Sequence, residues 1–565
     1  MTKYPPLRGI ERRVLRNRIL ALLTIFAGLS LAACDAGNQQ PARAAPTVPA
    51  PPAPPPPPPP AGPVTISGSI TFDLAPLNPA TNGLNYNNIT QAPARGVTVR
   101  AVNGTGTILD SDVTNNAGNY SVSVPANTNV RIQALAQFSQ TTGGSRSIEV
   151  RDNTNGNALY TLSGSLTGSG TVNSTRNLNA PSGWGGASYT GTRAAAPFAI
   201  LNSLFTAVGA FVAIDNNLDM PHLQVLWSVN NTTADGDIAD GDIGTSFYSR
   251  INNIPSIVLL GAANNDTDEY DQHVIVHEFG HYFEDQLARS DSIGGPHGQG
   301  DILDSTVAFS EGFGNALSAI ALGDPIYRDS LGPSQNSGFN FNMENNTHAD
   351  SGWFNEFSVH SIIYDIFDSA DDGADIISAG LGPIYTALTS SDFTDDPAFT
   401  TIFTFLNSLR NNSTISNTDL TALINAQSIN GSGSEGAGET NNGGIATALP
   451  LYQTVTVGGG AVTVCSVDDL GILNFLGNSA FLRLSISTSQ NYTLTMTQSS
   501  GLTGRDPDFH VSNLGQFEAI AESIDIDMEQ LVVTLAPGEY AIRAFDFLNN
   551  SAGNTGDSCY AFTVL

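Results

Sequence analysis

Apolar and polar residues alternate with a period of two in two regions of the chain, one near its beginning and one at its end. The clearest runs are residues 64–70, 97–102, 120–124, 481–486, 492–496, 531–535 and 540–544. Such alternation places one face of a strand in a core and the other toward solvent. Gly, Asn and Pro separate the runs, as expected for turns. We therefore expect two β-sandwiches, over residues 64–140 and 447–565.

Between these regions the apolar period changes to three and four. Residues 198, 201, 204, 205, 208 and 211 are apolar, which predicts a helix over 197–214, and helical patterns continue to about residue 429. Residues 141–190 are expected to be a strand-rich connection, and the glycine- and serine-rich stretch 431–446 a flexible linker. The pattern as a whole predicts a multidomain α+β protein, in which a domain over 191–430 is flanked by two β-sandwiches.

The first residues resemble an export signal. Five arginines precede the apolar run 19–33, which is too short to span a bilayer comfortably. Leu31, Ala32 and Ala33 then lead to Cys34 and resemble the bacterial lipoprotein box. This resemblance implies a signal peptide over 1–33, a lipid on Cys34, and anchoring in the cell envelope at the outer membrane or the periplasmic face of the inner membrane. An ordinary signal peptide followed by a chance cysteine is the alternative. The proline-rich residues 34–63 predict a polyproline II tether.

The cysteine count fits an exported protein. The chain has three cysteines, and if Cys34 carries lipid, Cys465 and Cys559 remain as a pair. A disulfide between them would close a loop of about 95 residues and stabilise the fold by about 4 kcal/mol through chain entropy. Two free, buried thiols are the alternative.

Charge narrows the range of partners. The 21 Lys and Arg against 52 Asp and Glu give a net charge of −31, which excludes a basic nucleic-acid binder. Among the acidic residues, Asp235, Asp237, Asp240 and Asp242 lie on glycine-containing turns. Oxygen ligands on such turns suit Ca²⁺, although solvated loops have the same composition.

The strongest chemical signal is the segment His277-Glu278-Phe279-Gly280-His281. Residues four apart share a helix face, so the imidazoles of His277 and His281 can bind one Zn²⁺ while Glu278 lies beside the metal. Apolar neighbours predict that the helix is buried, and burying these groups without a metal would cost several kcal/mol. A coincidental helix with exposed histidines is the alternative.

This motif resembles the zincin metallopeptidases. Glu284 and Leu287 stand where a metzincin would have Gly and His, so that branch is excluded. Residues 308–319 resemble the glutamate helix of the gluzincins, which implies that Glu311 is the third ligand. Asn315, one turn later, stands where thermolysin-like enzymes have an aspartate that orients a ligand histidine. Rival third ligands are His273, Asp285 and His297.

The resemblance also implies a mechanism. A water in the fourth metal position would be deprotonated by Glu278. A later helix would supply the donor to the oxyanion: His360 first and Tyr364 second, on a helix expected over 357–367. The alternative is an aromatic helix that packs on the core. The strand 255–261 is expected to be the edge that pairs with an extended substrate.

The flanking sandwiches carry weaker resemblances. Residues 64–138 look like a transthyretin-like or carboxypeptidase-regulatory-like domain, and the C-terminal sandwich is similar to the pre-peptidase C-terminal domain. Taken together, the sequence predicts a monomeric zinc peptidase with a zincin-like catalytic domain, a protein or peptide substrate, and membrane contact through Cys34. The alternative is a non-catalytic envelope surface or adhesion protein with a structural zinc and ligand-binding β-sandwiches.

Overall fold

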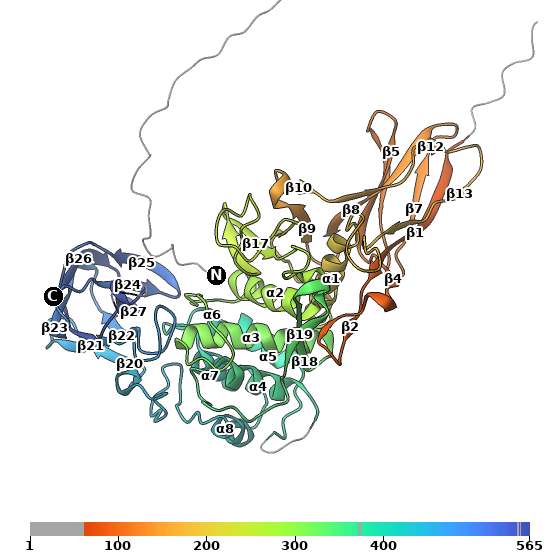
Figure 1. Cartoon of the computed structure of the whole chain (residues 1–565). Helices are drawn as coiled ribbons and strands as arrows, with labels where there is room; N and C mark the ends of the chain where they lie inside the picture. The colour runs from red at the N-terminus through yellow and green to blue at the C-terminus, as the bar shows by residue number, and fades with distance from the viewer. Residues whose placement is uncertain (1–61, 371–374, 551–552, 554) are drawn as a thin grey trace, which may run out of the picture.

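The computed structural model describes residues 62–370, 375–550, 553 and 555–565. The signal peptide, Cys34 and nearly all of the tether predicted over 34–63 therefore lie outside the described residues. The described chain is mixed α+β, with strands at both ends and a helical body between them (Figure 1). No helix in this part of the chain combines the length and the apolar character needed to cross a membrane.

The N-terminal sandwich is built from two sheets. In the first, β1 (Val64–Leu74) pairs with β4 (Thr90–Pro93), β7 (Asn119–Val124), β13 (Ser174–Thr175) and β14 (Leu178–Ala180). The second has the order β16 (Phe247–Ile251), β17 (Ile254–Leu259), β15 (Leu223–Trp227), β9 (Arg146–Asp152), β8 (Asn129–Gln140), β5 (Val97–Asn103), β6 (Ile108–Val113), with β10 (Ala158–Leu159), β11 (Thr161–Ser163) and β12 (Thr167–Gly168) at its side. The alternation in the sequence is realised in strands such as β7, where every second residue is buried.

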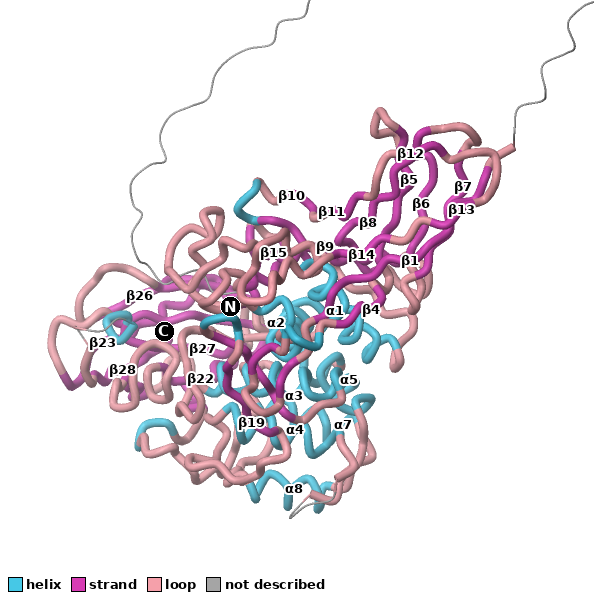
Figure 2. The backbone as a smooth tube through the Cα atoms, turned by 45° about the vertical axis from the view of Figure 1, so that its right-hand side comes forward, coloured by secondary structure: helices cyan, strands magenta, loops and turns pink. Residues whose placement is uncertain are grey.

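The second sheet runs without a break from the sandwich into the helical body. Strand β8 pairs with β9, and β9 pairs in parallel with β15. The boundary expected at residue 140 therefore falls between two paired strands. Figure 2 shows this continuous band of strands reaching the helices. Ile148 and Val150 of β9 are buried in the same core as the helices, so the sandwich and the helical body share one hydrophobic core.

The helical body packs against this sheet. Its helices are α1 (Ala196–Val212), α2 (Gln272–Leu287), α3 (Ser305–Leu322), α4 (Glu356–Phe367), α5 (Leu381–Thr389), α6 (Ser391–Thr394), α7 (Ile402–Asn412) and α8 (Asn417–Ala426). Two hairpins complete it, β18 (Ile326–Leu331) with β19 (Ser337–Asn342) and β2 (Leu77–Asn78) with β3 (Gly83–Leu84). The helices expected over 197–214 and 357–367 correspond to α1 and α4.

Glycine allows α2, α3 and α4 to pack closely. A Cβ at Gly280 of α2 would lie 2.9 Å from the Cα of Gly314 in α3, and a Cβ at Gly312 would lie 2.5 Å from the Cβ of Val359 in α4. Both distances are shorter than ordinary contacts between carbon atoms. Gly314 therefore lets the helix that carries Glu311 approach the helix that carries the histidines, and Gly312 lets it approach α4.

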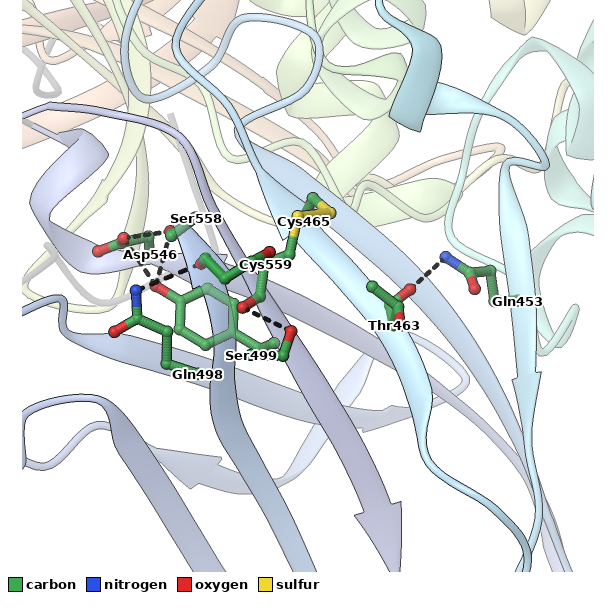
Figure 3. The surroundings of a disulfide bond; sticks show 10 residues. Gln453, Thr463, Cys465, Gln498, Ser499, Asp546, Ser558 and Cys559 are labelled. Carbon is green, nitrogen blue, oxygen red and sulfur yellow. Dashed lines mark hydrogen bonds between the residues drawn. A yellow bond between two sulfur atoms is a disulfide. The ribbon is translucent and has the colours of Figure 1, made fainter. Parts of the chain in front are cut away.

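The C-terminal sandwich has two sheets, which are antiparallel except for the parallel pair of β20 and β22, and a disulfide joins two neighbouring strands of one sheet. One sheet has the order β20 (Tyr452–Val455), β22 (Ser479–Ile486), β27 (Gly538–Asp546), β24 (Pro507–Asn513), β25 (Gln516–Ala521), and the other β21 (Val462–Ser466), β28 (Ser558–Val564), β23 (Gln490–Gly501), β26 (Met528–Leu535). Cys465 of β21 and Cys559 of β28 stand opposite each other and are bonded across 94 residues of sequence (Figure 3). The predicted disulfide is confirmed.

The stretch 431–446, expected to be a flexible linker, is instead a compact set of turns. The carboxylate of Glu439, which is 8% exposed, accepts hydrogen bonds from the backbone amides of Asn430, Gly431, Thr440 and Asn441. A buried carboxylate that binds backbone amides fixes the chain around it. The glycines here serve turn geometry, and the composition alone did not reveal the organising role of Glu439.

Candidate metal centre

The three ligands predicted from the sequence meet at one point. His277 and His281 project from α2 and Glu311 from α3, and all three are at least nine-tenths buried. The Nε2 atoms of the histidines lie 3.1 Å apart, and Oε2 of Glu311 lies 3.1 Å from Nε2 of His277 and 3.4 Å from that of His281. A tetrahedral zinc ion with bonds of about 2.0–2.1 Å requires ligand atoms about 3.3 Å apart. The donor atoms therefore fit a zinc ion in both chemistry and spacing.

Hydrogen bonds orient both imidazoles. Nδ1 of His277 lies 2.9 Å from Oδ1 of Asn315, in the position implied by the resemblance. Nδ1 of His281 lies 3.0 Å from Oγ of Ser310, whose hydroxyl donates to Glu284 Oε2 at 2.6 Å. When Nε2 faces a metal, Nδ1 carries the proton and donates to these partners. Each ring is thus held with Nε2 directed at Glu311.

The relay from His281 to Glu284 was missed in the sequence. Glu284 follows His281 by three residues and therefore lies on the same helix face, a spacing that could have revealed it. Ser310 precedes Glu311 on another helix, and nothing in its local sequence distinguishes it from the other serines of the chain. Sequence reasoning noted Glu284 only as a residue that excludes the metzincin pattern.

Charge in the centre is balanced between imidazoles and carboxylates. Burial by itself would lower the pKa of His281, but the carboxylates of Glu311 and Glu284 outweigh it and raise this pKa to about 10. Conversely, burial would raise the pKa of Glu311, but the surrounding histidines hold it well below its usual value. In the metal-free protein the His281 imidazole therefore carries an extra proton, whose positive charge balances the carboxylates. Binding of a metal ion would release this proton.

The centre opens into a cavity of about 450 Å³. Glu278 lines this cavity together with His277, His281 and Glu311. It therefore shares a solvent space with the proposed metal position without being one of the three clustered ligands, as predicted for a residue that acts on water.

His360 and Tyr364, predicted as oxyanion donors, are not among the residues that line the cavity. His360 is 1% exposed, stacks on Phe341 at 5.5 Å, and both of its ring nitrogens are buried without a hydrogen-bond partner. Burial also lowers its pKa well below the usual value. The expected role is therefore corrected: Phe341 and Phe357 line the cavity, and His360 packs against their rings instead of lining it.

Two other donors do line the cavity, Tyr327 of β18 and His297 of the loop between α2 and α3. Nε2 of His297 lies 3.5 Å from Glu311 Oε2, and the Tyr327 ring packs edge-on against His277 at 6.3 Å between ring centroids. From the sequence, His297 is expected only as a rival third ligand of the metal. Tyr327 was missed because it reaches the cavity from a hairpin far from the motif in sequence.

The remaining candidate ligands lie elsewhere. His273 Nε2 is 3.2 Å from the carbonyl oxygen of Asp324, and Asp285 Oδ2 accepts from Tyr248 and Arg250. The carboxylates of 235–242 are absent from the groups of metal-binding residues found in the described chain. Asp237, for example, accepts a hydrogen bond from the amide of Ala239 in its own loop.

The strand expected to pair with substrate is an inner strand. Residues 254–259 form β17, which lies between β16 and β15, and β16 is the edge strand at this end of the sheet. The first two residues of β16, Phe247 and Tyr248, line the cavity together with Thr245 and Ser246 just before the strand. The free backbone groups nearest to the centre therefore belong to β16 rather than β17.

Residues 217–423 match the family described as "Mycolysin C-terminal domain". The matched segment contains α2, α3 and α4, and with them all three clustered ligands and Glu278. This family is associated with peptidases, so the chain is related to a peptidase-associated family over this segment. No curated protein matches the chain.

Several solved structures are similar to about a fifth of the chain. The pre-peptidase C-terminal domain of collagenase from Bacillus anthracis is 11% identical, with a TM-score of 0.15, covering 20% of this chain and 94% of that one. CorA, a surface-associated copper-binding protein of Methylomicrobium album BG8, is 8% identical (TM-score 0.16, 20% and 98%). A family 35 carbohydrate binding module from Clostridium thermocellum is 14% identical (TM-score 0.13, 19% and 91%).

Proposed function

We propose that the protein is a zinc-dependent peptidase that hydrolyses protein or peptide substrates. The observation that carries this proposal is the set of donor atoms from His277, His281 and Glu311, spaced 3.1–3.4 Å apart at a cavity that Glu278 also lines. The match of this segment to a peptidase-associated family supports the same conclusion. Zinc fits the site because two neutral imidazoles and one carboxylate, all oriented, are a common catalytic zinc set.

The roles of the residues follow from their places around the cavity. A bound zinc ion supplies acidification of water and polarisation of a carbonyl group. Glu278 accepts the proton of the attacking water and returns it to the leaving amine. Tyr327 and His297, which line the same cavity, donate hydrogen bonds to the oxygen that becomes negative. The edge of β16 offers backbone groups to an extended substrate chain, which favours recognition of the backbone over a particular sequence.

The proposal is tested by separating metal binding from hydrolysis. Purified protein should contain one zinc per chain and cleave an unfolded protein substrate. Glu278→Gln should keep the zinc and lose activity by about a hundred- to ten thousand-fold, while Glu311→Ala should lose zinc and activity together. Asp237→Asn, in the solvated loop, is the matched control and should change neither. If the wild-type protein holds zinc but cleaves no peptide bond, the proposed peptidase activity is wrong and the zinc has a structural role.

We further propose that the protein acts outside the cytoplasm, tethered through lipid on Cys34. The disulfide between Cys465 and Cys559 supports an oxidising compartment. Metabolic labelling with a fatty acid, compared between wild type and Cys34→Ala, tests the anchor. The β-sandwich over 447–565 is proposed as a pre-peptidase-like module that accompanies the catalytic body.

A further inference from the structure

Three carboxylates come together on another wall of the cavity. Asp266 and Asp268 belong to the segment that leads into α2, and Asp329 belongs to β18. One oxygen of each lies within 4.8 Å of an oxygen of the other two, and all three line the cavity. We call Asp266, Asp268 and Asp329 the acid cluster. None of these residues serves the zinc chemistry described above.

Each carboxylate of the acid cluster has one buried oxygen without a hydrogen-bond partner. Asp268 is 2% exposed, and its Oδ1 is buried without a hydrogen-bond partner, as are Oδ1 of Asp266 and of Asp329. Within the described part of the chain, no ion pair includes any of the three. Burial raises the pKa of Asp268 well above its usual value, and the charges of Asp266, Asp329 and the nearby Asp271 raise it further. Buried carboxylates are expected to be paired or to bind a metal, and this group has no basic partner.

The backbone holds the two segments together whether or not anything is bound. Asp266 forms an isolated antiparallel bridge with Leu331, and the amide of Gly332 donates to the carbonyl of Asn265 at 2.8 Å. Ser246 donates a hydrogen bond to Oδ2 of Asp268, which leaves Oδ1 as the unpaired atom. The carboxylates are therefore brought together by strand pairing, at a cost in repulsion that a cation would remove.

We propose that Asp266, Asp268 and Asp329 bind a calcium ion. An all-oxygen set of carboxylates suits a hard cation, and Ca²⁺ accepts carboxylates in mono- or bidentate form, with water completing six to eight ligands. The ion joins the segment before α2, the helix that carries His277 and His281, to the hairpin β18–β19. That hairpin carries Tyr327, two residues from Asp329 on the same face of the strand. Calcium therefore fixes the wall of the cavity that includes Tyr327.

Calcium titration of the full chain tests this proposal. The Glu278→Gln variant, loaded with zinc, prevents self-digestion, and titration calorimetry should show one calcium per chain. Asp268→Asn and Asp329→Asn should each weaken calcium binding by about tenfold or more, whereas Asp237→Asn should leave it unchanged. This readout needs no peptidase activity, so it stands or falls separately from the proposed hydrolysis.

Thermal unfolding distinguishes a cation site from carboxylates that merely support the fold. Without calcium, Asp268→Asn removes a buried acid whose ionisation is opposed by burial and by the neighbouring carboxylates, so its melting temperature should equal or exceed that of wild type. With calcium, the wild type should become the more stable of the two. A wild type that takes up no calcium, or whose affinity is unchanged in both variants, would overturn the proposal. If the wild type takes up no calcium and the variants lose cleavage next to Lys or Arg, the carboxylates would instead bind basic side chains of the substrate.

Discussion

Because α3 packs closely on α2, a side chain added at Gly314 would disturb the His277 ring. A Cβ there would lie 3.0 Å from Nδ1 and Cε1 of the His277 ring, whereas carbon atoms in optimal contact are about 3.5–4.0 Å apart. In Gly314→Ala the ring must therefore withdraw by about 0.5 Å. Metal–ligand distances tolerate deviations of only about 0.2 Å, and the ring is also held by Asn315 at 2.9 Å. We expect zinc affinity to fall by about ten- to a hundredfold, the usual effect of disturbing the support of a ligand.

A matched control separates this effect from helix propensity. Gly209 lies in α1, and a Cβ there would meet no atom within 4 Å. Gly209→Ala should therefore raise the free energy of unfolding by about 0.5–1 kcal/mol and leave zinc binding unchanged. In Gly314→Ala the same gain is offset by overpacking, which costs about 1–3 kcal/mol. Zinc affinity is measured by competition with a chelator, and stability by urea unfolding. A Gly314→Ala protein with wild-type zinc affinity and the stability gain of Gly209→Ala would refute this reasoning.

Three further predictions concern stability. Arg543→Leu should lower the free energy of unfolding by about 3–5 kcal/mol, because it leaves the buried carboxylate of Asp304 without its cation at 2.7 Å; adding Asp304→Asn should recover part of the loss in urea unfolding. Replacing both Cys465 and Cys559 by alanine should cost about 4 kcal/mol in the same assay, and equal stability of the oxidised and reduced wild type would contradict it. Burial, with Asp266 nearby, raises the pKa of Asp329 to about 8, so the native state retains a proton that the unfolded state releases. Calcium-free protein should therefore lose stability as pH rises from about 4 to 8, by at most about 1.4 kcal/mol per pH unit, and Asp329→Asn should flatten this slope.

The sequence predicted the parts of the site that depend on helix periodicity. His277 and His281 are four residues apart, so one helix suffices to bring them together. Glu311 is predicted from a family resemblance, and the glycines near it have a physical role in the structure, since Gly314 permits close packing of α3 on α2 and Gly312 permits it on α4. The spacing of residues along a helix and the small size of glycine can both be read from a short stretch of sequence.

The parts that the sequence did not predict depend on long-range packing. His360 was expected at the cavity because it lies on a helix near the site, but its side of α4 faces the core behind Phe341. Which face of an amphipathic helix meets the cavity is decided by its neighbours, and α4 is buried nearly all round. Tyr327 reaches the cavity because β18 pairs with β19, and nothing in the sequence near the zinc motif indicates that hairpin. The acid cluster was missed for the same reason, since it joins residues about 60 positions apart.

The C-terminal sandwich contributes no residue to the lining of the cavity, but it holds the loop and the helix that do line it. The loop between α2 and α3 carries His297, and it is attached to this sandwich at several points. The side-chain amide of Asn474 donates to the carbonyl of Pro296 at 3.1 Å, and the amide of Leu476 donates to the carbonyl of Ile302. Arg543 of β27 then binds the N-cap of α3 through Asp304. A glycine-rich loop loses much conformational entropy on ordering, and these contacts offset that loss. The sandwich holds both the loop of His297 and the start of the helix that carries Glu311. The positions of the proposed metal ligand and of the proposed oxyanion donor therefore depend on a domain that contributes no residue to the centre itself.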